Sequence, residues 1–454
     1  MTMINDYDLK IINRNIYSMI LPVALESTLQ MVAGMVMMGM IGRIDAISVS
    51  ALGVSMRITQ MVWALFKGIT IGASVYVAQY YGAKEYYKMK HIMQQTILSS
   101  ILIVVILQII IYIYAPQLLS IFNPSPQLLE TAIAYIRTVS FGLPFLAIML
   151  VVGGVLQGMG NGKTPMVITM IMNIVNIIIG YVLIFGKFGF SPMGVKGAAI
   201  ATALSQFTAA ILGLYILMNK NGVLHSYLNK SFFSLDITKI RDIYRVGLPS
   251  SMESMFWQLA AIILTRAILT YGETAFAAHQ LGLQAEAISY MPAAGFSVAA
   301  TSFIGQALGS KDKKLAKIYL NQIIKGSLYL TTISVVILVF FPKNVMSLLT
   351  NDAEIIRLGS IYLILMGIVQ IPQNASGVLM GAMRGAGYTN IPMIVAGTGL
   401  WGIRVPSTLA VVYLFKSSII SIWIVMSIDM TFRFLLNLIL YNKKNIYDKV
   451  LSDS

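Results

Sequence analysis

The sequence predicts an all-α polytopic membrane protein, with twelve transmembrane helices in two pseudo-symmetric six-helix bundles around a central cavity. Two observations lead to this prediction. The chain is 57% hydrophobic and only 11% charged, with a mean hydropathy of +0.79, a composition that soluble globular proteins do not have. Its second half also repeats the first: Pro22 and Glu26 recur as Pro249 and Glu253, a constant offset in the numbering (253 − 26 = 227). A duplicated unit in so apolar a chain is typical of transporters built from two lobes.

The same offset holds along most of each half, which indicates two copies of one fold unit without a net insertion between the matching points. The matching pairs are Gly68 and Gly295, Gln79 and Gln306, Gly82 and Gly309, Gly154 and Gly381, Gly158 and Gly385, Gly160 and Gly387, Pro165 and Pro392, and Met166 and Met393.

Apolar runs long enough to cross a bilayer as helices recur throughout the chain. They are continuous, whereas the strands of a membrane barrel would alternate in short segments, so helices are predicted. The last two runs are poorly separated, at Lys416. The twelve predicted spans are 15–41, 51–81, 92–115, 128–158, 165–187, 195–218, 247–271, 274–308, 316–341, 355–384, 391–415 and 417–441.

The net charge of +15 is distributed in a way that argues against nucleic-acid binding. Lys and Arg gather in alternate loops, such as 220–245, while the loop 115–131 has none. This bias places the positive loops and both termini in the cytoplasm, for a protein of the inner (cytoplasmic) membrane. We predict an N-terminal six-helix lobe, a cytoplasmic linker, a C-terminal six-helix lobe and a cytoplasmic tail, at 1–219, 220–245, 246–441 and 442–454.

Catalytic and cofactor-binding patterns are missing from the sequence. There is no Cys, and the three His residues show no metal-ligand spacing. Clustered glycines do not follow a strand, and no phosphate-binding Walker A loop is present, so ATP does not drive the protein directly. We therefore expect neither an enzyme nor a bound cofactor or metal. The expected partners are the lipid bilayer and small organic cations, and we expect a monomer.

An ionisable side chain inside a membrane span costs about 2.5–3.5 kcal/mol and calls for an explanation. Glu253 is the first candidate, because Trp257 follows one helical turn later and Ser250 precedes it by about one turn, so that all three share one face of the helix. A carboxylate and an aromatic ring together suit an organic cation. The alternative is a Glu near a helix end that interacts with nearby Lys or Arg, since Pro249 favours a first turn there.

Glu26 is the duplicate of Glu253, and Gln30 occupies the position of Trp257. This polar pair could hold an ion or form hydrogen bonds between helices. Asn173 and Asn176 lie three residues apart and could offer neutral oxygens to a cation, or could equally join two helices by hydrogen bonds.

Further polar residues lie in the second half. Glu286 belongs to a polar cluster with His279, and either couples to an ion or forms a structural salt bridge with Arg266. Asp429 and Arg433 are four residues apart and can neutralise each other on one helix, so we interpret them as structural.

The sequence resembles the multidrug and toxic compound extrusion (MATE) family over essentially the whole chain. The resemblance rests on Leu-Pro-x-x-x-Glu-Ser opening both halves and on four further stretches, namely 194–202, 278–280 with 291–296, 305–309 and 384–387. It implies a V-shaped pair of six-helix bundles that exchanges inward H⁺ or Na⁺ for outward organic cations.

Two positions depart from this family's pattern. Members typically carry an Asp within a Val-Asp-Thr triplet midway along the first span, where this chain has Met37. Many also place an Asp one turn after Asn176, where this chain has Gly180. In several members the Glu of the second lobe stands where this chain has Trp257. These departures favour Glu253, then Glu26, as the coupling residue.

We therefore predict an ion-driven efflux antiporter for amphipathic cations. The alternative is a flippase of lipid-linked or other amphipathic anionic substrates, which would place Arg57, Lys67, Arg266 and Arg404 along its cavity. A membrane-embedded enzyme would need clustered catalytic His or Asp residues, which the sequence lacks.

Overall fold

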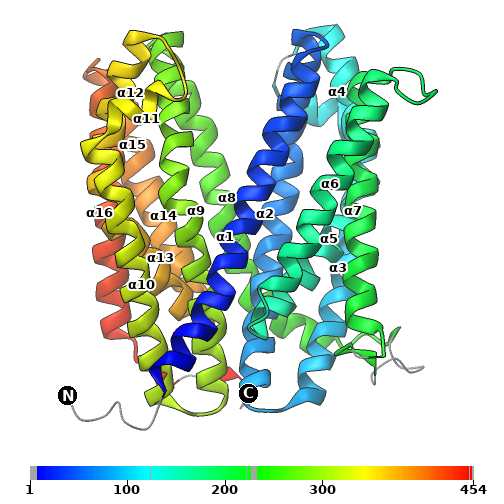
Figure 1. The fold of residues 1–454 in the computed structure, drawn as a ribbon, viewed down its shortest axis with the longest axis vertical. Helices are drawn as coiled ribbons and strands as arrows, with labels where there is room; N and C mark the ends of the chain where they lie inside the picture. Colours follow the sequence, from blue (N-terminus) through cyan, green and yellow to red (C-terminus); the bar gives the residue numbers. More distant parts are fainter. Residues whose placement is uncertain (1–7, 123, 221, 226–232, 449, 452–454) are drawn as a thin grey trace. The chain divides into compact units, whose positions relative to one another are not determined.

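The computed structural model describes residues 8–122, 124–220, 222–225, 233–448 and 450–451, and within these ranges every regular element is a helix. Ten helices are long and apolar enough to cross a membrane, and two further spans each consist of a bent helix pair. The predicted all-α class with up to twelve spans is confirmed (Figure 1).

Within the described residues, the first half of the chain forms seven α-helices. Ser125 caps the fourth of them, since its hydroxyl accepts a hydrogen bond from the backbone N–H of Leu128, and Pro126 follows at the first helical position. The helices are α1 (Leu9–Gly42), α2 (Ala46–Gly82), α3 (Tyr86–Ser120), α4 (Pro126–Ser140), α5 (Leu143–Gly158), α6 (Lys163–Phe185) and α7 (Gly194–Met218).

The second half begins with a longer helix than the sequence predicted. This helix starts at Ile237 rather than at 247, because the carboxylate of Asp236 accepts a hydrogen bond from the backbone N–H of Lys239 and caps it. The helical elements are α8 (Ile237–Leu269), α9 (Glu273–Gly309), α10 (Lys313–Phe340), α11 (Pro342–Ser347), α12 (Ala353–Ile368), α13 (Gln370–Gly385), α14 (Asn390–Gly397), η3 (Thr398–Arg404), α15 (Val405–Leu409), η4 (Ala410–Leu414), α16 (Ile419–Lys443) and η5 (Ile446–Asp448).

Two predicted spans are bent rather than straight. The pair α4–α5 bends by 51° and the pair α12–α13 bends by 49°. The breaks fall at Gly142 and Val369, which are equivalent positions of the repeat, so the two halves share the bend as well as the sequence pattern. The separation expected near Lys416 is also present, between the end of η4 and the start of α16.

Packing divides the chain into two compact units. Unit 1 comprises 1–24, 78–84 and 248–454, and unit 2 comprises 25–77 and 85–247. Both α1 and α8 therefore begin in one unit and continue in the other, with Pro22 and Pro249 inside these helices close to the crossing points. The lobe boundaries predicted from the sequence, and the cavity between the lobes, stay predictions.

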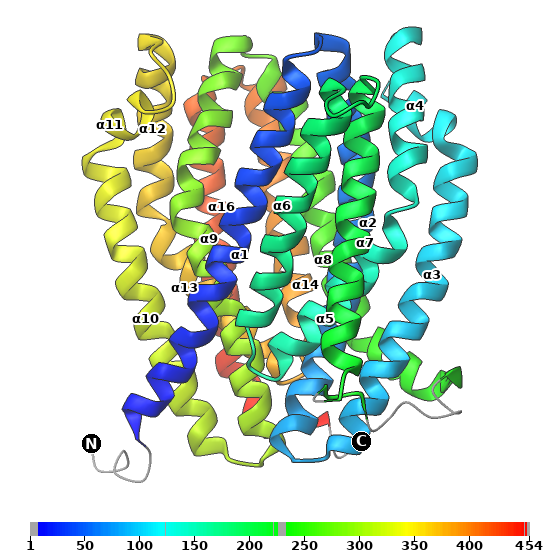
Figure 2. The ribbon, with the colours of Figure 1, turned by 45° about the vertical axis from the view of Figure 1, so that its right-hand side comes forward.

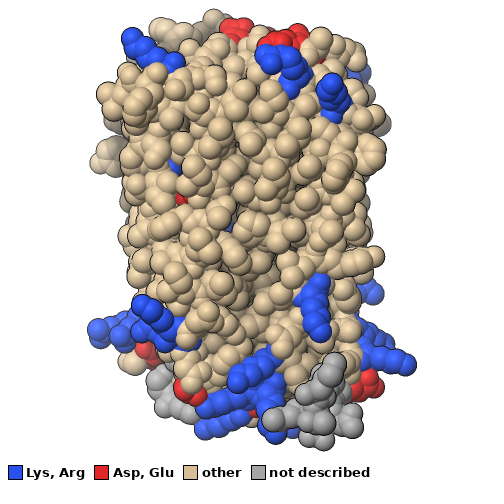
Figure 3. All heavy atoms as spheres, turned by 90° about the vertical axis from the view of Figure 1, so that its left-hand side faces the viewer, with Lys and Arg blue, Asp and Glu red and all other residues tan. Residues whose placement is uncertain are grey.

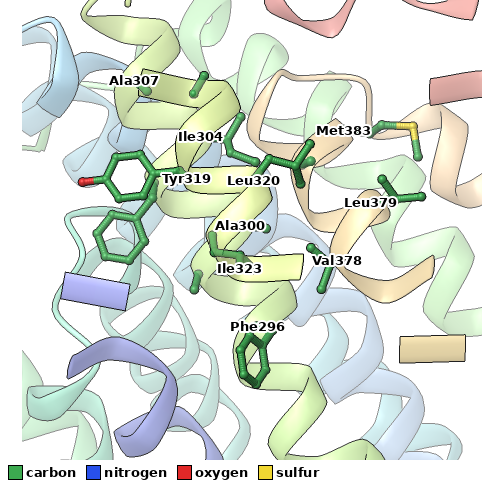
Figure 4. Close-up of a cluster of buried hydrophobic side chains, with 14 of the residues drawn as sticks. Phe296, Ala300, Ile304, Ala307, Tyr319, Leu320, Ile323, Val378, Leu379 and Met383 are labelled. Atoms are coloured by element: carbon green, nitrogen blue, oxygen red, sulfur yellow. The ribbon is translucent and has the colours of Figure 1, made fainter. Parts of the chain in front are cut away.

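Unit 1 is organised around α9, which packs along both α10 and α13. Figure 4 shows Ala300 and Ile304 of α9 facing Leu320 of α10, with Val378 and Leu379 of α13 closing the cluster. All five side chains are at most 4% exposed. A second cluster of unit 1 gathers around Trp423 and Tyr362, both fully buried.

The last turn of α2 belongs to unit 1 and crosses α9 at very short range. A Cβ atom added to Gly82 would lie 1.9 Å from the carbonyl oxygen of Gln306, and one added to Gly309 would lie 1.9 Å from that of Gln79. These are equivalent residues of the two repeats, so the crossing has its own local two-fold symmetry. Only glycine permits this approach of two backbones.

Unit 2 is built from α3 to α7, most of α2 and parts of α1 and α8. Its helices α6 and α7 run side by side, and α7 also contacts α4 and α5 (Figure 2). Large apolar side chains are exposed along many of the helices, as a surface in contact with lipid requires. Figure 3 shows one face of the molecule with a broad, almost uncharged band between two edges that both carry charged side chains, with more Lys and Arg at the lower edge.

Candidate functional site

The duplicated carboxylates lie in different surroundings. Glu253 of α8 is 7% exposed and forms an ion pair with Arg384, near the end of α13. The Arg384 Nη2 atom lies 2.6 Å from one carboxylate oxygen and 2.7 Å from the other. The charge of Glu253 is therefore compensated within the protein. The sequence indicates Arg384 only as part of a family motif. It does not show that Arg384 is the partner of Glu253, because the two residues are 131 positions apart.

Glu26 of α1 is partly buried and is held by neutral donors. Gln157 Nε2 lies 3.4 Å from one of its oxygens, and Thr169 Oγ1 donates to the other at 3.1 Å. Within the described residues no Lys, Arg or His forms an ion pair with this carboxylate, although the charge of Lys67 acts on it from α2. Lys67 itself lies 4.5 Å from the centre of the Trp63 ring.

Trp257 faces arginines of its own unit. The guanidinium carbons of Arg404 and Arg433 lie 5.3 Å and 4.6 Å from its ring centre. Both arginines also contact Asp429, which is fully buried, at 2.8 Å and 2.9 Å. The predicted pair of Asp429 and Arg433 is present, and Arg404 is a second cation on the same carboxylate.

A π-helical segment makes this cluster possible. In η3, Gly399 approaches Arg433 and Asp429 so closely that an added Cβ would lie 2.4 Å and 2.5 Å from their side chains. The segment ends at Arg404, whose Nη2 atom is buried without a hydrogen-bond partner among the described residues. Insertions of this kind are frequent where a helix re-aims side chains at a functional site.

Glu286 of α9 is 2% exposed and does not pair with Arg266, which is exposed on α8. The salt bridge offered as one interpretation is therefore not formed. Its carboxylate accepts hydrogen bonds from the Tyr362 hydroxyl at 2.6 Å and from Gln370 Nε2 at 2.8 Å. The ring of His279 packs edge-on against Tyr362.

The two predicted asparagines of α6 behave differently. Asn176 Nδ2 donates to Ser205 and Thr202 of α7, at 3.1 Å and 3.4 Å, which is the interhelical role. The Nδ2 atom of Asn173 is buried and has no hydrogen-bond partner within the described part of the chain. Gln30 is partly buried on the same helix as Glu26.

Met37 and Gly180, which stand where the family typically carries Asp, lie close together in the structure. In unit 2 an added Cβ at Gly180 would lie 2.8 Å from the Met37 Cε atom, so these two departures from the family's acids pack against each other. Of the four basic residues named for an anion-binding cavity, Arg404 is buried, while Arg57, Lys67 and Arg266 are exposed. No group of three His, Asp or Glu residues in the described ranges could hold a metal ion.

Comparison with protein families gives a match that follows the repeat. The MatE family matches residues 22–182 and again 249–410, and the two matches start at equivalent positions of the repeat, Pro22 and Pro249. The probable multidrug resistance protein NorM of Thermotoga maritima is 30% identical to this chain, over 95% of it and 92% of that relative. The probable multidrug resistance protein YoeA of Bacillus subtilis is 25% identical, over 90% and 89%.

Solved structures share the fold. A transporter of the MOP superfamily from Pyrococcus furiosus superposes with a TM-score of 0.86 at 20% sequence identity, covering 95% of each chain. An outward-facing multidrug resistance MATE family transporter gives the same TM-score and identity, over 94% of this chain and 95% of that one. The two-lobe helical fold predicted from the repeat is thereby confirmed.

Proposed function

The chain belongs to the multidrug and toxic compound extrusion (MATE) family of transporters, and from this premise we propose that it is a secondary active efflux transporter. It exchanges H⁺ or Na⁺ moving inward for amphipathic organic cations moving outward. The names of its relatives in Thermotoga maritima and Bacillus subtilis, both probable multidrug resistance proteins, support efflux of drugs.

The proposal that transport is coupled to an ion is based on the surroundings of the Glu26 carboxylate. This carboxylate lies on an apolar helix, and its contacts come from the uncharged groups of Gln157 and Thr169. A carboxylate in such surroundings favours a proton or a small cation as its counter-charge. It can therefore exist in two states, loaded and unloaded, which antiport requires.

Exchange follows if the coupling ion and the drug stabilise opposite-facing conformations. Each must bind one conformation more tightly than the other, because a ligand with equal affinity for both does not shift the equilibrium between them. Alternating access in proteins with repeated halves is largely a rocking of one bundle against the other. The helices α1 and α8, which each contribute to both packing units, connect the two carboxylates to such a movement.

We place the protein in the inner (cytoplasmic) membrane, as a monomer with both termini in the cytoplasm. The crowding of Lys and Arg into alternate loops supports this orientation of the two termini.

The test is movement of a fluorescent organic cation in proteoliposomes, first under an imposed proton gradient and then under a sodium gradient. We expect movement that depends on one of the gradients and stops when that gradient is dissipated. Movement of the cation under neither gradient would contradict the proposed exchange.

A second function is favoured by the arginine cluster of unit 1. Arg404 and Arg433 share the carboxylate of Asp429, which leaves an excess of positive charge in a buried place. A flippase of lipid-linked or other amphipathic anions would use such a surplus. The same vesicles loaded with a fluorescent anionic amphiphile distinguish the two functions, because the cation transporter leaves the anion in place.

A further inference from the structure

We propose that one residue in each repeat, Gln157 in the first and Arg384 in the second, decides which of the two duplicated carboxylates binds the coupling ion. Glu26 is the binding site for the monovalent cation, and Glu253 is excluded from that role by Arg384. This inference rests on the proposed ion-driven antiport, and it names the residue that takes the ion.

The repeat and the contacts agree on the correspondence. Glu26 and Glu253 are equivalent positions of the repeat, and so are Gln157 and Arg384, because 253 − 26 and 384 − 157 are equal. In unit 2 the side chain of Gln157 donates to Glu26, and in unit 1 the side chain of Arg384 donates to Glu253. The same contact is thus made twice, once by a neutral amide and once by a guanidinium.

In unit 1 the carboxylate has no need of an external cation. Arg384 Nη2 bridges both oxygens of Glu253 at 2.6 Å and 2.7 Å, and the two side chains are 15% and 9% exposed. A cation that bound there would have to displace a buried guanidinium and leave it uncompensated, which is strongly unfavourable. Glu253 and Arg384 therefore act as a fixed pair between α8 and α13.

In unit 2 the corresponding carboxylate keeps free lone pairs. A carboxylate has about four acceptor sites, and Gln157 and Thr169 take one each. Both neighbours also carry a side-chain oxygen, and hydroxyl, amide and carboxylate oxygens are the ligands that hard cations prefer. In unit 1 the equivalent of Thr169 is Ala396, which offers no oxygen from its side chain.

The charged group that acts on Glu26 within the described residues is Lys67 of α2. Its position in the second repeat is held by Ala294, so the two sites differ here as well. Lys67 weakens cation binding without abolishing it, because its charge acts at longer range than an ion pair. An ion bound at Glu26 is therefore released more readily than one held by an isolated carboxylate, as turnover requires.

The experiment measures ion binding to the purified full-length protein in detergent, so that it does not depend on transport. Proton binding is followed by the pH change when the organic cation or NaCl is added to weakly buffered protein. Sodium binding is followed with ²²Na⁺, which unlabelled NaCl should displace and KCl at the same ionic strength should not. The two arms distinguish H⁺ from Na⁺ at the same carboxylate.

Four variants use the repeat as its own control. Glu26→Gln and Gln157→Arg should each abolish ion binding, the second by giving Glu26 the partner that Glu253 has. The double variant Glu253→Gln/Arg384→Gln should bind as the unaltered protein does, since it removes an internal pair without leaving a buried charge. Arg384→Gln alone should add a second bound ion per chain.

Retained ion binding in both Glu26→Gln and Gln157→Arg, or its loss in the double variant, would overturn the proposal. If Arg384→Gln does not fold, the comparison of Gln157→Arg with the double variant still decides the matter. The variants could bind ions as expected while the protein moves no organic cation. That result would support Glu26 as the ion site and would reject organic cations as the substrate.

Discussion

At the scale of single residues, the repeat preserves positions while changing their chemistry. Glu26 and Glu253 are identical, but their partners, Gln157 and Arg384, differ in charge. Gln30 and Trp257 differ likewise, and Trp257 lies against two arginines. One fold unit therefore gives two sites of different electrostatic character, and only one of them is suited to a transient ion.

The pair of Glu253 and Arg384 predicts a characteristic pattern of stability. Glu253→Gln alone leaves a buried guanidinium uncompensated and should lower the free energy of unfolding by about 3–5 kcal/mol. The double variant Glu253→Gln/Arg384→Gln should lose much less. Unfolding of the unaltered protein, Glu253→Gln, Arg384→Gln and the double variant in detergent forms a double-mutant cycle, and additive losses would show that the two side chains are not coupled.

The contacts around Asp429 lead to a second prediction. Asp429→Asn removes the carboxylate that both Arg404 and Arg433 share, so two buried cations are left facing each other. We expect a strong loss of thermal stability, partly recovered when Arg433→Gln is added. Ser427→Ala is a suitable control on α16, because its hydroxyl donates to backbone carbonyls and faces no charge. Equal effects of the two substitutions would contradict the charge argument.

The ionisable residues of these sites could be identified from the sequence more readily than the residues that contact them. The contact of Asp429 with Arg433 follows from a spacing of four residues, and the structure has it. The contacts of Glu253 with Arg384 and of Glu286 with Tyr362 join residues 131 and 76 positions apart, which no periodicity reveals. Only the repeat could have related Gln157 to Arg384, because each stands directly before an equivalent glycine, Gly158 or Gly385.

At the scale of elements, helix ends are held by specific polar contacts. The start of α8 is tied to α3: His91 Nε2 lies 3.1 Å from Asp236 Oδ2, and Gln95 Nε2 donates to the carbonyl of Ser234 at 2.8 Å. The backbone N–H of Asp236 in turn donates to Gln95 Oε1 at 2.8 Å. These contacts explain why the helix begins well before the point that hydropathy indicates.

The capping carboxylate also gives a pH dependence. Hydrogen bonds from His91 and from the backbone N–H of Lys239 lower the pKa of Asp236 below its usual value. A lowered pKa in the folded state means that the cap stabilises the folded protein above the unfolded value of about 3.9 and is lost as the pH falls through the lower folded value.

Amide hydrogen exchange in the first turn of α8 checks this. At neutral pH, Asp236→Ala should exchange faster there than the unaltered protein does. The difference should persist down to about pH 4 and disappear below it. Asp242→Ala, on the same helix but without a capping role, is the control. A difference that vanished well above about pH 5 would contradict the assignment.

The segment after α16 closes over the end of α2 within unit 1. The backbone N–H of Leu451 donates to Gln79 Oε1 at 2.7 Å, and Gln79 Nε2 donates to the carbonyl of Gly385 at 2.9 Å. The Leu451 side chain packs against Gly387, while Asp448 forms an ion pair with Lys313. Gln79 is fully buried, so this bridge replaces water that cannot reach it.

Removal of residues 446–454 should therefore loosen the last turns of α2. We expect faster amide exchange over 78–84 in that variant. Unchanged exchange in the shortened protein would mean that the glycine crossing of α2 and α9 holds this segment without the tail.

At the scale of the whole molecule, the repeat accounts for the helix order, the two bends and the two-fold match to the MatE family. Hydropathy and the constant offset between the repeats sufficed to predict the spans, because long apolar runs have no other stable form in lipid. They did not reveal that α1 and α8 each take part in both packing units. Membership of both units depends on which residues of each helix pack against which neighbours, and hydropathy alone does not show this.

The predicted orientation is testable because the chain has no Cys. Lys314 lies at an exposed position in the first turn of α10, and Ser191 at an exposed position between α6 and α7, on opposite predicted sides. The single substitutions Lys314→Cys and Ser191→Cys should therefore react with a membrane-impermeant maleimide from opposite faces. In intact cells only Ser191→Cys should be labelled, and Lys314→Cys should need permeabilised cells. The reverse pattern would invert the topology.

Gradient-driven movement of an organic cation should be compared in proteoliposomes that contain the unaltered protein, Glu26→Gln, or Glu253→Gln/Arg384→Gln. Ion coupling at Glu26 predicts that a proton or sodium gradient drives transport by the unaltered protein and by the double variant alike, and that Glu26→Gln is inactive although folded. Full activity of Glu26→Gln, or loss of activity in the double variant alone, would contradict it.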